Sequence, residues 1–359
     1  MAEVFPKESI DALAIGAWIL GTGGGGSPYL AQLNLKHLYA QGKRCRLIQP
    51  EDLADDDIVA VVSQMGAPLV AQERLVDPTY LARAVRLMEE YLGQRFAAIM
   101  AVEIGGGNAF SPFLAAALLD LPVVDADAMG RAFPEAQNTS FAIGNLKMYP
   151  LSLVDCRDNE AIVSKVPSWI WMERISRKIT TEVGSIAATC KAPRTGAEVK
   201  EWGILHTVTK AIGIGEAVLK ARRVHANPIT SILDQEGGIQ LFAGKVTDVD
   251  RITTGGFLRG SAQFAGLGES QGQRFVLEFQ NEWLVALGND EPLAMSPDLI
   301  CVLDTDSGEA IGTETVRYGQ RVTVVVLPSP DILRTTQGLE NVGPRAFGYD
   351  FDYRSVFSQ

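Results

Sequence analysis

The chain has 359 residues, of which 47% are hydrophobic, and a formal net charge of −11 at pH 7. This length and apolar content are sufficient for a large core or two domains, which argues against a largely disordered protein. The negative charge argues against a nucleic-acid or anionic-membrane partner, because both require a basic surface. The apolar run 12–20 is shorter than the roughly 20 residues that span a bilayer.

The four cysteines are scattered and form no CxxC motif. They are Cys45, Cys156, Cys190 and Cys301. Disulfide-rich and zinc-binding small domains use dense or regularly spaced cysteines, which this chain lacks. The cysteine pattern therefore favours a reducing, cytoplasmic location.

The first half of the chain alternates apolar strands with helices. Strands are predicted at 44–48, 58–63, 96–102 and 122–124, and helices at 9–20, 28–39, 78–92 and 112–119. Such alternation implies right-handed crossovers and a largely parallel sheet. We therefore expect an α/β domain over residues 1–167.

The second half changes character near Pro167. A strand is predicted at 179–188, then one long helix at 195–223 that begins with a capping box formed by Thr195 and Glu198. From residue 229 onward, short apolar runs alternate with turn residues, which is typical of a β-sandwich or barrel. Residues 168–359 are therefore expected to form a mainly β domain.

Loops that contain glycine, proline or acidic residues follow several of the predicted parallel strands. Because such strands end at one edge of a sheet, the loops at 64–68, 104–108 and 125–131 should share that edge. The glycine loop 21–26 is placed to join them from the preceding helix. Ligand sites of open α/β sheets lie at this edge.

Carboxylates end two of these strands. Asp125 and Asp127 are two residues apart and share one face in strand geometry, so they are candidates to bind a cation or to act as an acid and a base. The alternative is that one caps a helix while the other pairs with Arg131. Glu103 is a second acid–base candidate. Arg131 is a candidate clamp for a substrate carboxylate, or a surface partner of Glu135.

Gly105, Gly106 and Gly107 follow Glu103 and allow a backbone to approach a ligand closely. Their N–H groups suit an anion or a developing oxyanion, and the Asn108 amide suits a ring carbonyl. The alternative is a tight turn in which Asn108 caps a helix.

Gly23, Gly24 and Gly25 lie in a loop that precedes a helix, where backbone amides favour negative charge. The loop lacks the Gly-Lys-Ser/Thr of a phosphate-binding P-loop and does not follow a strand. It therefore favours a small anionic substituent of the substrate over a nucleotide.

His206 is one of only three histidines and lies on the predicted long helix. It is the best imidazole available for binding a metal or transferring a proton. The alternative is an ordinary solvated surface histidine.

Eight segments of the chain resemble the S-methyl-thiohydantoin desulfurase-like family, whose genes often accompany hydantoinase and oxoprolinase subunits. The segments are GTGGGGSPY (21–29), MGAP (65–68), EIGGGN (103–108), VVDADAMGRAFPE (123–135), TTGGFLRG (253–260), FQNE (279–282), PDLICVLD (297–304) and GPRAFGYD (343–350). The resemblance spans nearly the whole chain. It implies that water attacks the ring carbon bearing a methylthio group, so that methanethiol leaves and a hydantoin remains.

Two functional hypotheses follow. The first is a hydrolase of a small five-membered cyclic amide or thioimidate, assisted by Asp125, Asp127, Glu103 or His206 and by a divalent metal ion if these groups bind one. The second is a non-catalytic partner subunit of a hydantoinase- or oxoprolinase-type enzyme. A homo-oligomer is expected in either case. A nucleotide-binding enzyme that uses the loop 21–27 is a weaker third alternative.

Overall fold

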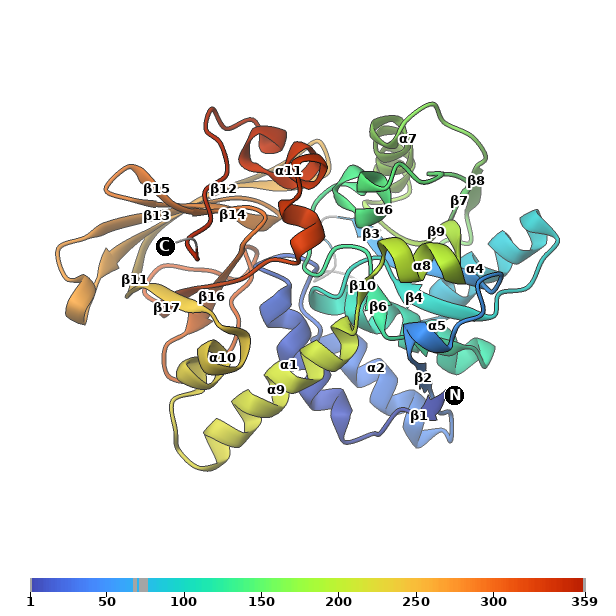
Figure 1. Cartoon of the computed structure of the whole chain (residues 1–359), viewed down its shortest axis with the longest axis horizontal. Helices are drawn as coiled ribbons and strands as arrows, with labels where there is room; N and C mark the ends of the chain where they lie inside the picture. Colours follow the sequence, from blue (N-terminus) through green and yellow to red (C-terminus); the bar gives the residue numbers. More distant parts are fainter. Residues whose placement is uncertain (1, 67–69, 71–76, 358–359) are drawn as a thin grey trace.

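A computed structural model describes residues 2–66, 70 and 77–357 (Figure 1). They form an α/β domain and a mainly β domain that lie side by side, which confirms the predicted fold class. Helices α1 (Ser9–Leu20) and α9 (Thr207–Arg223) pack together where the two domains meet.

The first domain is built on a mixed sheet with the order β1-β2-β5-β4-β3-β9-β7-β8. The four neighbours β2, β5, β4 and β3 are parallel, whereas β1, β9, β7 and β8 are antiparallel to their neighbours. The predicted parallel sheet is thus confirmed for these four strands. The strands are β1 (Glu3–Val4), β2 (Arg46–Ile48), β3 (Ile58–Gly66), β4 (Ala98–Ala101), β5 (Pro122–Val124), β7 (Leu151–Val154), β8 (Glu160–Val163) and β9 (Ile186–Thr195).

Both faces of this sheet are covered, which explains its nearly continuous apolar strands. Val62, Ile99 and Val123 belong to a core shared with α1, α4 and α5, while Val61 and Met100 belong to a second core with α6 and α8. The other α-helices among the described residues are α2 (Tyr29–Ala40), α4 (Thr79–Leu92), α5 (Ser111–Leu119), α6 (Ser140–Ile143), α7 (Trp169–Glu182), α8 (Gly196–Trp202), α10 (Pro228–Glu236) and α11 (Thr336–Val342).

Two predicted elements of the second half were wrong. The strand expected at 179–188 begins only at Ile186, where β9 starts, because residues 179–182 are the end of α7. Helix α7 begins at a Ser168 cap and buries Met172, Ser176 and Thr180 at helical spacing. The helix expected at 195–223 is two helices, α8 and α9, although its capping box is present. Between them the backbone is extended at β10 (Ile204–Leu205), which pairs with β6 (Ala126–Asp127).

The chain returns to the first sheet after the expected boundary at residue 167. Strand β9 pairs with both β3 and β7, so residues from the second half complete the first sheet. The second sheet begins only at Ile239.

The second sheet is antiparallel and curved into a half-barrel, with the order β15-β14-β13-β12-β11-β17-β16. Within its core Phe242 stacks on Phe275, and Phe264 meets both rings edge-on. Its strands are β11 (Ile239–Thr254), β12 (Phe257–Gly266), β13 (Arg274–Gln280), β14 (Glu282–Gly288), β15 (Glu291–Met295), β16 (Leu299–Asp304) and β17 (Arg321–Leu327).

None of the helices among the described residues combines the length and apolar character needed to cross a bilayer.

Glycines allow α1 and α9 to approach closely. A Cβ at Gly16 would overlap the Ala211 carbonyl, and a Cβ at Gly215 would overlap the Ala12 carbonyl. Apolar residues of the second sheet, including Leu299 and Leu327, share one core with these helices. The spacing of α1 and α9 therefore affects how both domains pack.

We predict that Gly215→Ala destabilises the protein by about 1–3 kcal/mol, because the added methyl overpacks the contact with α1. Gly213→Ala on the same helix is the matched control, since its Cβ would meet only the flexible Gln235 side chain. The control should be stabilised by about 0.5–1 kcal/mol, because alanine is the better helix former. Urea unfolding of both variants measures the difference, and equal effects would contradict the close-packing argument.

Candidate functional site

The loops 21–26, 64–66, 104–108 and 125–131 meet at one edge of the first sheet, as predicted. The Gly107 N–H donates to the carbonyl oxygens of Gly25 and Gly26 at 3.0 and 2.9 Å, and the Ile104 N–H donates to Asp127 at 2.8 Å. The clustering of the four loops is therefore confirmed for the described residues. Residues 67 and 68 lie outside them.

A pocket with a cavity of ≈ 140 Å³ opens at this edge, between the glycine loops, helix α7 and the β13–β14 hairpin of the second domain. An apolar cavity of about 150 Å³ holds benzene, so this volume suits a single small ring. Residues with charged or amide side chains in the pocket wall are Gln64, Glu103, Asn108, Glu135, Glu173, Arg177, Lys191, Asn281 and Glu282.

Glu103 follows β4 and is buried in the pocket wall. The Asn108 amide donates to its Oε1 at 2.5 Å, and the Phe133 N–H donates to its Oε2 at 3.2 Å. Burial raises the pKa of Glu103 to about 7, although these two bonds and the charge of Lys191 oppose the rise. A carboxyl group with this pKa exchanges protons readily at neutral pH.

Asn108 has a fixed orientation beside Glu103. Its Oδ1 accepts from the Gln64 N–H at 2.7 Å, which directs its Nδ2 toward the Glu103 carboxylate. The sequence suggested that this amide orients a substrate. In the structure it also lines the pocket and holds an acid there.

Glu282 enters the pocket from the second domain. It follows Asn281, a turn residue at φ 60° whose side chain accepts from the Leu258 N–H at 2.8 Å. Glu282 is 2% exposed, and its Oε2 has no hydrogen-bond partner among the described residues. Burial raises the pKa of Glu282 well above its ordinary value, and the nearby Glu103 carboxylate raises it further. Two acids in one pocket therefore influence each other's protonation.

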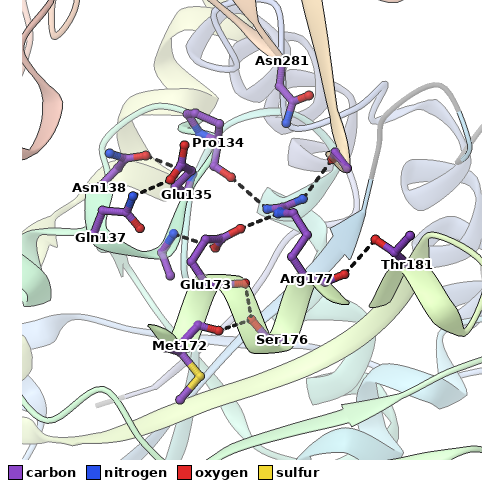
Figure 2. A network of polar contacts seen from close by, with 12 residues as sticks. Pro134, Glu135, Gln137, Asn138, Met172, Glu173, Ser176, Arg177, Thr181 and Asn281 are labelled. Carbon is purple, nitrogen blue, oxygen red and sulfur yellow. Dashed lines mark hydrogen bonds and ion pairs between the residues drawn. The ribbon is translucent and has the colours of Figure 1, made fainter. Parts of the chain in front are cut away.

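Helix α7 contributes an ion pair to the pocket wall. Figure 2 shows Glu173 and Arg177 side by side on this helix, with the Arg177 guanidinium directed toward the Pro134 carbonyl, to which it donates at 2.9 Å. Arg177 also donates to the Gly256 carbonyl at the β11–β12 turn, at 3.1 Å. The pair thereby joins both domains beside the pocket.

Asp125 is a helix cap, and the described pocket residues do not include it. Its Oδ1 accepts from the Val208 and Thr209 N–H groups at 2.8 and 3.1 Å, and its Oδ2 accepts from the Thr209 hydroxyl. A carboxylate at this position stabilises the N-terminus of α9. Of the two readings of this residue, the structure favours capping, although the capped helix comes from far along the chain.

Asp127 organises the glycine loop. Its Oδ2 accepts from the N–H groups of Ile104, Met129 and Gly130 at 2.8, 3.2 and 2.8 Å. Burial raises the pKa of Asp127 to about 7, against the effect of these bonds. Asp125 and Asp127 therefore serve different backbone segments, and the structure does not bring them together on one ligand.

His206 lies on the surface at the start of α9, where its side chain is 51% exposed. Its ring contacts Glu51 Oε1 and Gln49 Oε1, each at 3.1 Å. The structure does not place this imidazole among the described pocket residues. It therefore favours the alternative that His206 is an ordinary surface histidine.

Arg131 is fully buried between the domains and uses all of its donors on the protein. It donates to the carbonyls of Ala132, Pro297, Asp298 and Trp283 and to the Thr22 hydroxyl. It therefore has no donor left for a substrate carboxylate. The structure therefore gives no support to the predicted clamp on a substrate carboxylate, nor to a surface pair with Glu135: Arg131 is buried and binds carbonyls and a hydroxyl of both domains.

The glycines of the two loops mainly permit close packing. A Cβ at Gly23 would overlap the Trp283 ring, one at Gly24 the Glu282 carboxylate, and one at Gly25 the Gly105 carbonyl. Gly105 and Gly106 are equally tight against Ala132 and Gly25. The Gly107 N–H is already bonded, so it is not free to stabilise an oxyanion.

Family models match nearly the whole chain. The model described as "S-Me-THD-like, N-terminal domain" matches residues 8–165, and "S-Me-THD-like, C-terminal domain" matches residues 167–356. The chain belongs to the S-Me-THD-like family. No curated protein matches the sequence significantly.

A crystal structure of a protein from Chromobacterium violaceum, solved by structural genomics, has the same fold. Its TM-score is 0.80 at 22% identity, over 98% of this chain and 99% of that one. At this identity the likeness supports the fold alone. The family's name associates it with S-methyl-thiohydantoin chemistry, which the sequence resemblance had also indicated.

For this S-Me-THD-like chain, sequence reasoning missed Lys191 and Glu282 as pocket residues. Each left a signal. Lys191 is the one charged residue among the first eight of β9, and Glu282 directly follows an apolar strand and a turn residue, much as Glu103 follows β4.

The pocket does not offer an evident set of metal ligands. Among the described residues, no group of three or more His, Cys, Asp and Glu side chains is arranged to hold a metal ion. Glu103 and Glu282 share the pocket with the cationic Lys191 and Arg177, which compete with a metal for their charge. The described pocket residues therefore do not fit the divalent metal ion that the sequence analysis considered.

We predict that Asp125→Ala lowers the free energy of unfolding by about 1–3 kcal/mol, because it leaves buried N–H groups at the start of α9 without an acceptor. Asp125→Asn, which keeps one acceptor oxygen, should cost less. Urea unfolding measures both. If either variant lost ligand binding while keeping wild-type stability, Asp125 would have a role in the functional site and not only in capping α9.

Proposed function

We propose that this S-Me-THD-like protein hydrolyses a small five-membered cyclic thioimidate or amide of the S-methyl-thiohydantoin type. One observation carries the proposal: two buried carboxyl groups with raised pKa values, Glu103 and Glu282, share a pocket sized for one ring. Paired acids in different environments can divide into a base and an acid. The family assignment supplies the substrate class.

In this proposal Glu103 is the general base. With a pKa of about 7 it is substantially ionised at neutral pH, and it accepts a proton from a water molecule that attacks the ring carbon bearing sulfur. Asn108 keeps the carboxylate directed into the pocket through its 2.5 Å bond.

Glu282 is the general acid. Burial raises its pKa well above the ordinary value and favours the protonated form, and in this proposal it donates to the ring nitrogen as the carbon–nitrogen double bond receives the attacking water. When the resulting tetrahedral intermediate collapses, its hydroxyl proton returns to Glu282. The intermediate thus carries no full charge on the ring.

We predict that Glu103→Gln and Glu282→Gln each lower kcat/KM for thiol release by about 10²–10⁴-fold, the usual contribution of a positioned acid or base. Glu314→Gln is the matched control, because Glu314 is also buried with a pKa raised to about 7 but is not among the described pocket residues. The control should keep wild-type activity. If all three variants had the same kcat/KM, the assignment of Glu103 as base and Glu282 as acid would be wrong.

The pH profile of kcat/KM should be bell-shaped. Because the base form of Glu103 is required, activity should fall about tenfold per unit as the pH drops below about 7. Because Glu282 must keep its proton, activity should fall again at higher pH. Thiol release measured from pH 5 to 10 tests this profile. If the fall in activity below about pH 7 disappears in Glu103→Gln, that fall is due to protonation of Glu103. A flat profile would contradict the proposal.

The partner-subunit hypothesis is tested by the same preparation. Thiol release by the purified chain alone, unchanged by a chelator, supports the proposal. No release alone, but release after addition of a hydantoinase- or oxoprolinase-type subunit, would favour the partner role. Release abolished by the chelator would instead point to a divalent metal.

A further inference from the structure

A second, smaller cavity of ≈ 20 Å³ adjoins the pocket inside the first domain. The two cavities share Val102, Ala136 and Lys191 in their walls. The rest of the small cavity is mostly apolar and rich in methionine and aromatic groups. Its distinctive members are Phe141, Met148, Leu151, Trp169 and Met172. We call this cavity the inner chamber.

The inner chamber has room for about one group the size of a methyl or a water. Besides Lys191, its charged member is Arg194, whose guanidinium lies over the Phe141 ring at 4.7 Å and donates to the Lys147 carbonyl at 2.7 Å. The Arg194 Nε and the Trp169 Nε1 have no hydrogen-bond partner among the described residues. The rest of the wall is methionine, aromatic and aliphatic, and such side chains make favourable contacts with sulfur-bearing groups, so the chamber suits a small, soft substituent.

Lys191 stands where the two cavities meet. Strand β9 places it opposite Val61, and its side chain forms no hydrogen bond or ion pair with the described residues. Burial lowers the pKa of Lys191, although the charges of Glu173 and Glu103 oppose that change. A lowered pKa makes the ammonium a better proton donor. Lys191 is half-buried and lies between a ring-sized pocket and the chamber, so its ammonium is available to a ligand there.

We propose that the inner chamber receives the S-methyl group of the substrate and that Lys191 donates a proton to the departing sulfur. The proposal rests on the hydrolase function above. With the methyl group in the chamber, the sulfur lies at the junction of the cavities, where the Lys191 ammonium is. Lys191 is then a catalytic residue, and the chamber sets which S-alkyl groups are accepted.

The proton balance closes without a further reactant. Water adds to the ring carbon, giving one proton to Glu103, while Glu282 protonates the ring nitrogen. The carbon–sulfur bond then breaks, its electron pair goes to sulfur, and Lys191 supplies the proton that completes methanethiol. The carbonyl forms as the hydroxyl proton returns to Glu282, and Glu103 passes its proton to the neutral Lys191 amine.

The first test is a series of S-methyl, S-ethyl and S-propyl thiohydantoins. The wild type should prefer S-methyl over S-ethyl by about 10–200-fold in kcat/KM, the usual effect of one methylene in a tight apolar site. Met172→Ala enlarges the chamber and should reduce this preference at least tenfold. Met88→Ala is the control, because Met88 is an equally buried helical methionine in a different core cluster. It should leave the preference unchanged.

The second test removes the ammonium. Lys191→Ala should lose most thiol release, and added methylamine should restore it at least tenfold, which a purely structural role would not allow. Lys191→Arg should retain more activity than Lys191→Met. Circular dichroism and thermal melting check that the variants fold.

The outcomes separate the two proposals. No thiol release by the wild type would remove the hydrolase function itself. Release by the wild type with no S-alkyl preference, or with an undiminished preference in Met172→Ala, would remove the chamber assignment. Full activity of Lys191→Met, or activity of Lys191→Ala that methylamine does not raise, would remove the role of Lys191.

Discussion

The arrangement of this protein depends on one buried guanidinium. Arg131 lies between the domains and donates to carbonyls at Pro297, Asp298 and Trp283 on the second domain and to the Thr22 hydroxyl at the first glycine loop. Burial lowers the pKa of Arg131 to about 10, so it stays charged at neutral pH. Truncating such a group leaves several buried acceptors unpaired, which is costly.

This contact determines where the pocket acids lie. Trp283 is held both by Arg131 and by the Thr22 carbonyl, which accepts its N–H at 2.8 Å, so the neighbouring Glu282 is carried to the edge of the first sheet. Gly23 and Gly24 have no side chains and so allow this approach. The glycine loop therefore contributes to the proposed chemistry by admitting an acid from the other domain.

Position relative to the pocket separates these acids by role. Asp125 accepts from two N–H groups and a hydroxyl, and Asp127 accepts from three N–H groups through its Oδ2, so both hold backbone segments in place. Asp127 and Glu282 each have an oxygen without a partner among the described residues, and the pKa of Asp127 is raised like that of Glu103. Of these four acids, Glu103 and Glu282 line the described pocket, so they are the better candidates for proton transfer.

The sequence by itself determined the fold class, the parallel direction of β3, β4 and β5 and the edge at which their loops meet, because these follow from local periodicity and from the handedness of strand–helix–strand units. It also identified Glu103 and Asn108, which follow a predicted strand directly. Only the tertiary structure decided that Asp125 caps α9, that Arg131 serves the second domain, and that Lys191 and Glu282 join Glu103. Those relations link residues about 80 to 180 positions apart, and both the side-chain partners and the degree of burial arise only when the domains pack.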